Sequence, residues 1–346
     1  MEELAEIFKA EGYALEELLF SDCWGELYRA RYVPHAREVL LRRFPAALAS
    51  DEGAWELMVA EVRAWARLDH PGILRVLDWG IAGRVSGAPA CARAGAGGES
   101  FLATEMPAGT RLDALLEGCG PGGSAPGGRA TEDTVIISLL AAVEEARAWG
   151  MLHLGLSPAC VWVSAGGHVQ VGEFGLWYVT RDFPSCGARD DPFLAPEQRS
   201  GGRVGAATDV YTLAVLCAFI HGGAEAAEAA SAGGVLPDGP GGMAGVLSRC
   251  LDERPLARYR SAGELAGALW PGLSPADEPG GAEEGFHDCP LCRIKRELER
   301  HTVAGTLREY RQAGAAPVRS PAVAYGWMVA LALAVACAVV WWMALR

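Results

Sequence analysis

A stretch in the middle of the chain, residues 153–175, places a polar loop next to an acidic turn. After the loop come two short alternating apolar runs, 161–163 and 169–171, separated by a glycine pair. This pattern predicts a β-hairpin. The hairpin would hold the loop beside the carboxylate of Glu173, where a cation could bind. A hairpin beside a polar loop is also a common structural feature without chemistry.

The spacing of this stretch resembles the catalytic and magnesium loops of the protein kinase superfamily, H-R-D-x-K-P-x-N followed by D-F-G. His153, Pro158 and the Phe-Gly pair after Glu173 stand in their places. The other positions carry replacements: Leu154 for the Arg, Gly155 for the base Asp, Ser157 for the Lys and Cys160 for the metal-binding Asn.

These replacements remove the polar groups that phosphoryl transfer uses. A glycine at 155 cannot orient a hydroxyl nucleophile, and the Cys160 thiol is a poor ligand for a hard cation that prefers oxygen. Glu173 retains a carboxylate, one methylene longer than Asp. We therefore expect degenerate positions in place of a catalytic centre.

The segment from Leu15 resembles the first hairpin of a kinase, whose glycine-rich turn covers the nucleotide phosphates. Gly25 fits the end of that motif, but Phe20 and Asp22 stand where the first two glycines belong. Close approach of the backbone to phosphate requires glycine, and Asp22 adds a repulsive charge. We expect weakened ATP binding at this turn.

The next strand, 38–44, matches the family's V-A-I-K strand with Arg42 at the lysine position. The planar guanidinium is bulkier than an ammonium group and prefers bidentate geometry. A helical pattern over 52–68 resembles the αC helix, so Glu61 would pair with Arg42. The alternative is that Glu61 lies on a solvated helix face.

The strand at 101–106 resembles the one that enters the interlobe hinge, with Thr104 in the gatekeeper place and Glu105 after it. ATP and Mg²⁺ would be the cofactors if the cleft binds any. The resemblance assigns their contacts to Gly25, Arg42, Glu61, Thr104, Glu105 and Glu173, with Glu173 as the magnesium ligand.

Other motifs resemble those of the family more closely, and A-P-E matches as it stands. Residues 195–197 read A-P-E, Asp209 opens an apolar helix, and Arg258 ends a C-L-x-x-x-P-x-x-R segment. The resemblance implies a buried Glu197–Arg258 ion pair whose loss would cost on the order of 3–5 kcal/mol. Glu197, Asp209 and Arg258 are structural residues by this interpretation.

The resemblance predicts an α+β, two-lobed protein kinase-like fold over residues 13–270. A small β-rich N-lobe would cover about 13–106, and a large helical C-lobe about 107–270. The pattern of retained scaffold motifs and replaced chemical motifs is typical of a pseudokinase, most similar to the bacterial Ser/Thr kinase branch.

Composition limits the partners and the compartment. The 346 residues carry a net charge of −13, and no basic stripe is present, which argues against nucleic acid as a partner. Ten cysteines, mostly isolated, indicate a reducing compartment. The acidic N-terminus shows no signal peptide.

Two further segments follow the predicted kinase-like domain. Residues 271–285 form a Pro/Gly/acidic linker, and 286–312 form a charged juxtamembrane helix that begins with a CxxC pair, Cys289 and Cys292. This pair resembles one knuckle of a zinc ribbon, with His287, His301 or a second chain completing the ligands. The alternative is two free thiols.

Residues 322–345 are 24 residues without a charge, flanked by aromatic residues. At about 1.5 Å per residue they can cross a hydrocarbon core of about 30 Å, so we expect a transmembrane helix. A buried core helix is the alternative. Because the arginines lie mainly before this stretch, the kinase-like domain would be cytoplasmic, with no sensor domain beyond the membrane.

These observations lead to three hypotheses. The first is a catalytically inactive signalling or scaffolding module that is anchored in the membrane lipid and binds other proteins, possible oligomers included. The second is an unorthodox nucleotide-dependent phosphoryl or nucleotidyl transferase in which Glu173 holds a metal and Arg42 contacts phosphate. The third is an adaptor whose active part is the segment around Cys289.

Overall fold

The N-lobe is built on one antiparallel sheet with the strand order β1-β2-β3-β5-β4. The computed structural model describes residues 2–22, 24–82, 98–117, 129–180, 191–234, 236 and 242–271. The strands of this sheet are β1 (Tyr13–Asp22), β2 (Gly25–Tyr32), β3 (Arg37–Arg43), β4 (Val76–Ala82) and β5 (Glu99–Glu105). The helices of the lobe are α1 (Glu2–Ala10), α2 (Ala46–Ser50) and α3 (Glu52–Trp65), and a 3₁₀ turn spans Val33–His35.

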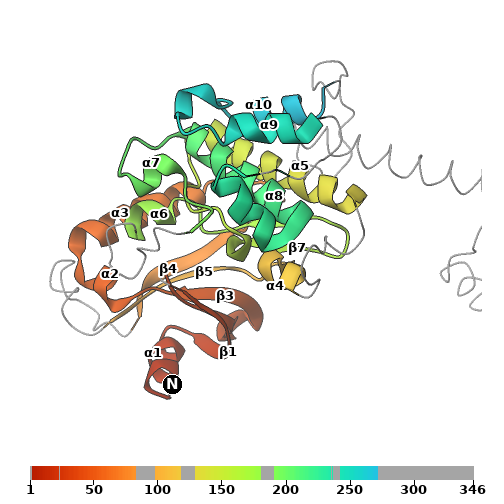
Figure 1. The fold of residues 1–346 in the computed structure, drawn as a ribbon. Helices are drawn as coiled ribbons and strands as arrows, with labels where there is room; N and C mark the ends of the chain where they lie inside the picture. The colour runs from red at the N-terminus through yellow and green to blue at the C-terminus, as the bar shows by residue number, and fades with distance from the viewer. Residues whose placement is uncertain are drawn as a thin grey trace, which may run out of the picture. The chain divides into compact units, whose positions relative to one another are not determined.

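The two faces of the sheet follow from the alternation of apolar residues along β3. Leu40 belongs to the large core that continues into the C-lobe, whereas Val39 and Leu41 belong to a smaller core on the opposite face. Helix α1 covers that smaller core with Phe8, whose ring meets Phe101 edge-on at 5.6 Å. Figure 1 shows α1 against the sheet.

The packed lobe therefore begins before residue 13. No helix or strand is predicted for residues 1–14, because a helix of nine residues has too few apolar positions to give a clear periodic pattern. Their position is fixed by tertiary packing, since Phe8 is fully buried.

The C-lobe is mainly helical (Figure 1). Its central helices are α5 (Arg129–Ala148) and α8 (Ala206–Ser231), and α8 is interrupted at Gly223, where φ is +70°. The shorter helices are α4 (Leu112–Glu117), α6 (Leu176–Thr180), α7 (Pro196–Arg199), α9 (Met243–Cys250) and α10 (Ala262–Leu269), with 3₁₀ turns at Pro158–Cys160 and Pro255–Ala257.

A small second sheet carries the stretch singled out in the sequence. It consists of β6 (Thr110–Arg111), β7 (Val161–Val163) and β8 (Val169–Val171) in the order β6-β7-β8. The predicted hairpin is confirmed, because Val161 pairs with Val171 and Val163 with Val169. The N–H of Leu74 donates to the carbonyl of Val171 at 2.9 Å and so joins the segment before β4 to β8.

The predicted two-lobed α+β fold is thus confirmed. Within the described residues, α8 is the one helix long and apolar enough to cross a membrane, and 67% of its most apolar stretch is buried in the C-lobe. The described residues also contain no group of three or more His, Cys, Asp or Glu side chains placed to hold a metal. The predicted linker, the Cys289–Cys292 pair and the span 322–345 lie outside the described residues.

Candidate functional site: a closed interlobe cleft

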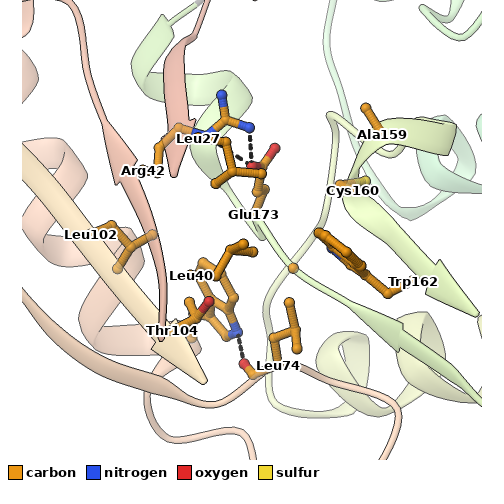
Figure 2. A pocket seen from close by; sticks show the side chains of 12 residues that line it. Leu27, Leu40, Arg42, Leu74, Leu102, Thr104, Ala159, Cys160, Trp162 and Glu173 are labelled. Carbon is orange, nitrogen blue, oxygen red and sulfur yellow. Dashed lines mark hydrogen bonds and ion pairs between the residues drawn. The ribbon is translucent and has the colours of Figure 1, made fainter. Parts of the chain in front are cut away.

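An apolar cavity lies between the N-lobe sheet and β7 (Figure 2). Leu27, Leu40 and Leu102 line it from strands β2, β3 and β5, and Trp162 of β7 lines it from the other side. Its volume is about 20 Å³. A cavity of roughly 10–15 Å³ or more holds a single water molecule, so the cleft is nearly filled by its own side chains.

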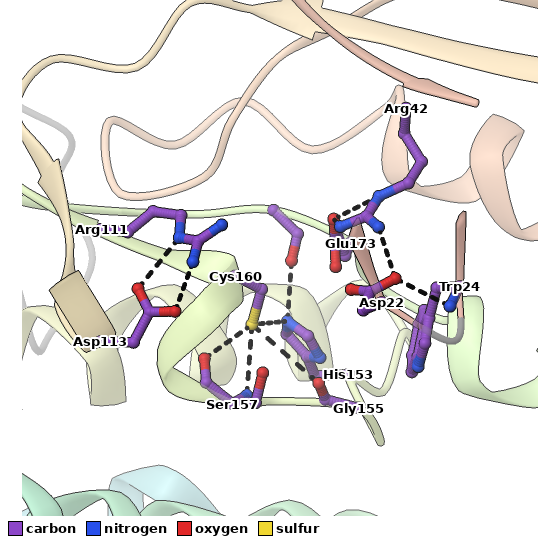
Figure 3. A network of polar contacts seen from close by, with 11 residues as sticks. Asp22, Trp24, Arg42, Arg111, Asp113, His153, Gly155, Ser157, Cys160 and Glu173 are labelled. Atoms are coloured by element: carbon purple, nitrogen blue, oxygen red, sulfur yellow. Dashed lines mark hydrogen bonds and ion pairs between the residues drawn. The ribbon is translucent and has the colours of Figure 1, made fainter. Parts of the chain in front are cut away.

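The polar end of the cavity is occupied by Arg42 and two carboxylates (Figure 3). Arg42 Nη1 donates to Asp22 Oδ1 at 2.9 Å, and Nε donates to Glu173 Oε1 at 2.9 Å. Nη2 donates to the same Glu173 oxygen. The Arg42 side chain is 3% exposed, and those of Asp22 and Glu173 are 21% and 17% exposed. All three guanidinium nitrogens are therefore used inside the protein.

Charge balance explains why this cluster is stable in the cleft. Burial raises the pKa of Glu173, and the neighbouring Arg42 charge opposes that shift while Asp22 reinforces it. Arg111 of β6 also lowers the pKa of Glu173. Arg42 thus balances Asp22 and Glu173, while Arg111 is paired with Asp113.

The predicted Glu61–Arg42 pair is wrong. Arg42 is held by Asp22 and Glu173, and Glu61 forms no ion pair with any described residue. The Glu61 carboxylate lies against Gly175, where a Cβ would collide with its Oε2. Burial raises the pKa of Glu61. Arg42 pairs elsewhere because Asp22, at the end of β1, places a carboxylate where the kinase motif has a glycine.

Gly155, at the position of the kinase base, is covered by Trp24. A Cβ placed on Gly155 would lie 2.5 Å from Cη2 and 3.1 Å from Cζ2 of the indole. Side chains at residue 155 are therefore excluded by a residue of the N-lobe. The backbone N–H of Trp24 donates to Asp22 Oδ1 at 2.8 Å, which ties the tryptophan to the Arg42 cluster.

Cys160 closes the loop that the kinase Asn would use to hold metal. Its Sγ donates to the Ser157 carbonyl at 3.1 Å and accepts from the Ser157 N–H at 3.2 Å. Burial raises the pKa of Cys160 to about 12, so the thiol stays protonated at neutral pH. A neutral, internally bonded thiol is a structural group and not a metal ligand.

The backbone of this loop is fixed from below by α8 and α7. Asp209 accepts from the N–H groups of His153 at 2.9 Å and of Leu154 at 2.7 Å, and Gln198 Nε2 donates to the Leu154 carbonyl at 2.6 Å. These bonds hold Leu154 at φ +61°, a conformation that non-glycine residues rarely adopt. The scaffold role implied for Asp209 rests on these two bonds.

A column of aromatic rings links α3 to the loop. The Phe174 ring lies 6.0 Å from the Trp65 ring and 4.5 Å from the His153 ring, measured between centroids. His153 Nε2 donates to the Gly172 carbonyl at 2.9 Å, and burial lowers its pKa to about 4. His153 is therefore a neutral packing residue at physiological pH.

The Glu197–Arg258 ion pair implied by the resemblance is present in the C-lobe. Arg258 Nη1 donates to Glu197 Oε1 at 2.8 Å and Nη2 to Oε2 at 2.9 Å. Thr208 Oγ1 donates to the same carboxylate at 2.7 Å, and the arginine also donates to three backbone carbonyls. A buried pair this fully bonded fixes the segment after α7.

The remaining candidate residues have local roles. Gly25 adopts φ +116°, and a Cβ there would collide with the Arg43 carbonyl of β3, so glycine is required by strand packing. Thr104 is buried and lines the cavity. Glu105 is bonded to the backbone of Arg75 through its N–H and its carboxylate, at 3.0 and 3.1 Å.

The residues present do not fit a magnesium–ATP complex. Magnesium requires free oxygen ligands, and the Glu173 carboxylate is bonded to Arg42 while Cys160 offers a protonated thiol. The phosphate end of the cleft presents Asp22, which would repel a phosphate.

Sequence reasoning missed Trp24, Arg111 and Gln198. A signal for Trp24 was present, because Phe20, Asp22 and Trp24 alternate at the end of the first hairpin. No comparable signal pointed to Arg111. Its role depends on Phe20, whose ring centroid lies 3.9 Å from the Arg111 guanidinium carbon.

No family model matches the chain. The chain is 26% identical over 328 residues to the Ser/Thr-protein kinase PknH of Mycobacterium bovis, and the match covers 89% of this chain and 50% of that protein. It is 27% identical over 330 residues to the Ser/Thr-protein kinase pkn3 of Myxococcus xanthus, covering 89% and 52%. The chain thus spans about half the length of these curated relatives.

Solved structures share the fold. The kinase domain of Mycobacterium tuberculosis PknI has a TM-score of 0.54 and 25% identity, and the match covers 75% of this chain and 95% of that one. A second crystal structure of the same domain gives 0.55 and 23% identity, covering 75% and 94%. The chain is therefore related in sequence to bacterial Ser/Thr protein kinases and shares the protein kinase fold.

Proposed function

We propose that this chain is a catalytically inactive, protein kinase-like signalling or scaffolding module that binds other proteins and is tethered to the membrane. One observation carries the inactivity: Arg42 is bonded to both Asp22 and Glu173, while Trp24 covers residue 155. Phosphate, metal and catalytic base would each need a position that the protein fills with its own side chains.

The intact scaffold supports a binding role. The bonds from Asp209, the Glu197–Arg258 pair and the aromatic column at Phe174 are structural, and each is made by the chain's own residues. A fold maintained in this way presents stable surfaces to partners. The uncharged residues 322–345 support the membrane tether. The arginines before them support a cytoplasmic location of the kinase-like domain.

The test is ATP binding by the full chain in detergent, followed as thermal stabilisation with and without Mg²⁺ or Mn²⁺. We expect no shift at millimolar nucleotide. A ligand at 100 times its Kd adds roughly 2.7 kcal/mol of stability, so a saturable shift would contradict the proposal. An active bacterial Ser/Thr kinase treated identically is the positive control.

A phosphate-transfer assay addresses the enzyme hypothesis directly. That hypothesis uses Glu173 for metal and Arg42 for phosphate, and both groups are bonded to each other in the structure. Transfer of labelled phosphate that disappears in the Glu173→Ala variant would establish the transferase hypothesis and contradict the proposed inactivity. We expect no transfer from either protein.

A further inference from the structure

Three side chains at the end of β1 and in the turn after it contact three different parts of the cleft. Phe20 and Asp22 belong to the end of the strand, and Trp24 lies in the following turn, where its backbone N–H donates to Asp22 Oδ1 at 2.8 Å. We call these three the latch side chains. Each contacts a group that belongs to, or is bonded to, the C-lobe.

The first contact is a stacking pair. The Arg111 guanidinium of β6 lies over the Phe20 ring at 3.9 Å from its centroid, and it is held flat by Asp113 at 2.9 and 2.5 Å. A desolvated cation on an aromatic face is attractive, and this one joins the two lobes.

The second contact is the ionic bridge. Asp22 reaches Glu173 of the C-lobe through Arg42, which both carboxylates share. The third contact is packing of the Trp24 indole on Gly155, at the place where a side chain would otherwise stand. Trp24 and Asp22 are coupled through the 2.8 Å bond from the tryptophan N–H.

We propose that the latch side chains act as a built-in substitute for a nucleotide, holding the two lobes together in the absence of any ligand. This inference rests on the proposed function and deepens it, because it names what regulates the cleft. It also explains Gly155: glycine is required there because the indole occupies the space of a side chain.

Because the latch is intramolecular, its contacts form at a fixed effective concentration and do not depend on nucleotide level. The relative position of the lobes, and any partner surface that spans them, is then constant. An ordinary kinase cleft lacks this property, since its connector is a diffusible ligand.

The test is a double-mutant cycle on the full chain in detergent without nucleotide. Gly155→Ala should lower the folding equilibrium constant by roughly tenfold or more, because the new Cβ meets the indole at 2.5 Å. In the Trp24→Ala background the same change should cost less than about threefold, because the obstructing ring is gone. An equal loss in both backgrounds would overturn the latch.

Gly245→Ala is the matched control, since no atom lies within 4 Å of a Cβ at that position in α9. It should cause no loss in either background. If Gly155→Ala yields no folded protein, the double variant decides. Recovery of a cooperative unfolding transition supports the latch, and failure to recover contradicts it.

Hydrogen exchange provides a second measurement, because a purely local effect of a substitution at Trp24 would not change exchange in the other lobe. In Trp24→Ala, the backbone of 153–157 in the other lobe should exchange faster, because its cover is lost. Unchanged exchange there would contradict the latch. ATP binding by the wild-type chain would instead contradict the proposed inactivity, and the cycle without nucleotide would still report on the latch.

Discussion

Arg42 shows how one substitution changes what a kinase cleft can hold. A lysine offers one compact charge, whereas the guanidinium fork can donate to two carboxylates at once. Asp22 and Glu173 use that fork from two lobes, at 2.9 Å each. The charge that would attract phosphate is thereby neutralised from within, and the Asp22 carboxylate would repel phosphate from the same place.

Removing this cation should leave two partly buried carboxylates unpaired. We expect Arg42→Met to lower the free energy of unfolding by about 3–5 kcal/mol, as for other buried ion pairs that lose one partner. Urea unfolding followed by circular dichroism measures the change. The control is Arg254→Ala, whose arginine is 80% exposed and pairs with Asp252, and it should cost far less because solvent screens an exposed pair. Equal losses in the two variants would contradict the buried bridge.

The buried His153 side chain should make the stability of the fold depend on pH. Burial lowers its pKa from the usual 6.5 to about 4, so between these values the unfolded chain binds a proton that the folded chain excludes. Stability from this group is complete above pH 6.5 and is lost as pH falls toward 4, by roughly 3 kcal/mol. Asp209 acts in the opposite direction, because burial raises its pKa to about 6.

The His153→Gln variant isolates this effect, since glutamine can also donate to the Gly172 carbonyl. We expect its urea midpoint to fall less than that of the wild type between pH 6.5 and 4.5. Parallel pH profiles for the two proteins would show that His153 does not remain neutral in the fold.

Residue types alone were enough to predict what the site lacks. Glycine at 155 cannot act as a base, and the Cys160 thiol is a poor ligand for magnesium, in any arrangement of the loop. The partner of Arg42 did depend on geometry. Glu61 and Asp22 are both acidic and both near in the expected fold, and only the register of β1 with β2 decides which carboxylate reaches the guanidinium.

At the scale of elements, the column of rings connects α3 with the loop above α8. Phe174 is fully buried between Trp65 and His153, and Asp209 bonds the backbone of that histidine. The N-lobe helix and the C-lobe core are thus in contact through packed side chains, independently of the latch.

Truncating the centre of this column should open a cavity. Phe174→Ala is expected to lower the free energy of unfolding by about 3–5 kcal/mol, the range for a fully buried phenylalanine. Trp149→Ala is the control, because that ring is 65% exposed and should contribute little. Differential scanning calorimetry of both variants checks the prediction, and a small loss for Phe174→Ala would mean that the rings are not tightly packed.

The elements were predictable where periodicity was long or the turns were distinctive. The hairpin at 161–171 followed from the alternation of its apolar residues. Helix α1 could not be predicted in the same way, because its burial comes from Phe101 and Tyr13 of the sheet.

At the scale of the whole molecule, two stretches of the sequence are long and apolar enough for a membrane span. One is α8, which lies mostly buried in the C-lobe and supplies Asp209 to the loop at His153. Its apolar surface is thus already used for packing. The other stretch is 322–345, which carries no charge and has aromatic residues near both ends.

Deletion of residues 322–345 tests which of these two stretches anchors the chain in the membrane. We expect the full chain to stay with membranes after alkaline carbonate extraction, and the shortened chain to be released with its cooperative unfolding transition intact. The physical reason is that α8 is packed inside the kinase-like fold and cannot insert without unfolding it. Retention of the shortened chain in the membrane would contradict the tether at 322–345. The Arg42→Met variant of the full chain is a useful companion, because it should weaken the fold without changing membrane retention, so that anchoring and folding are measured independently.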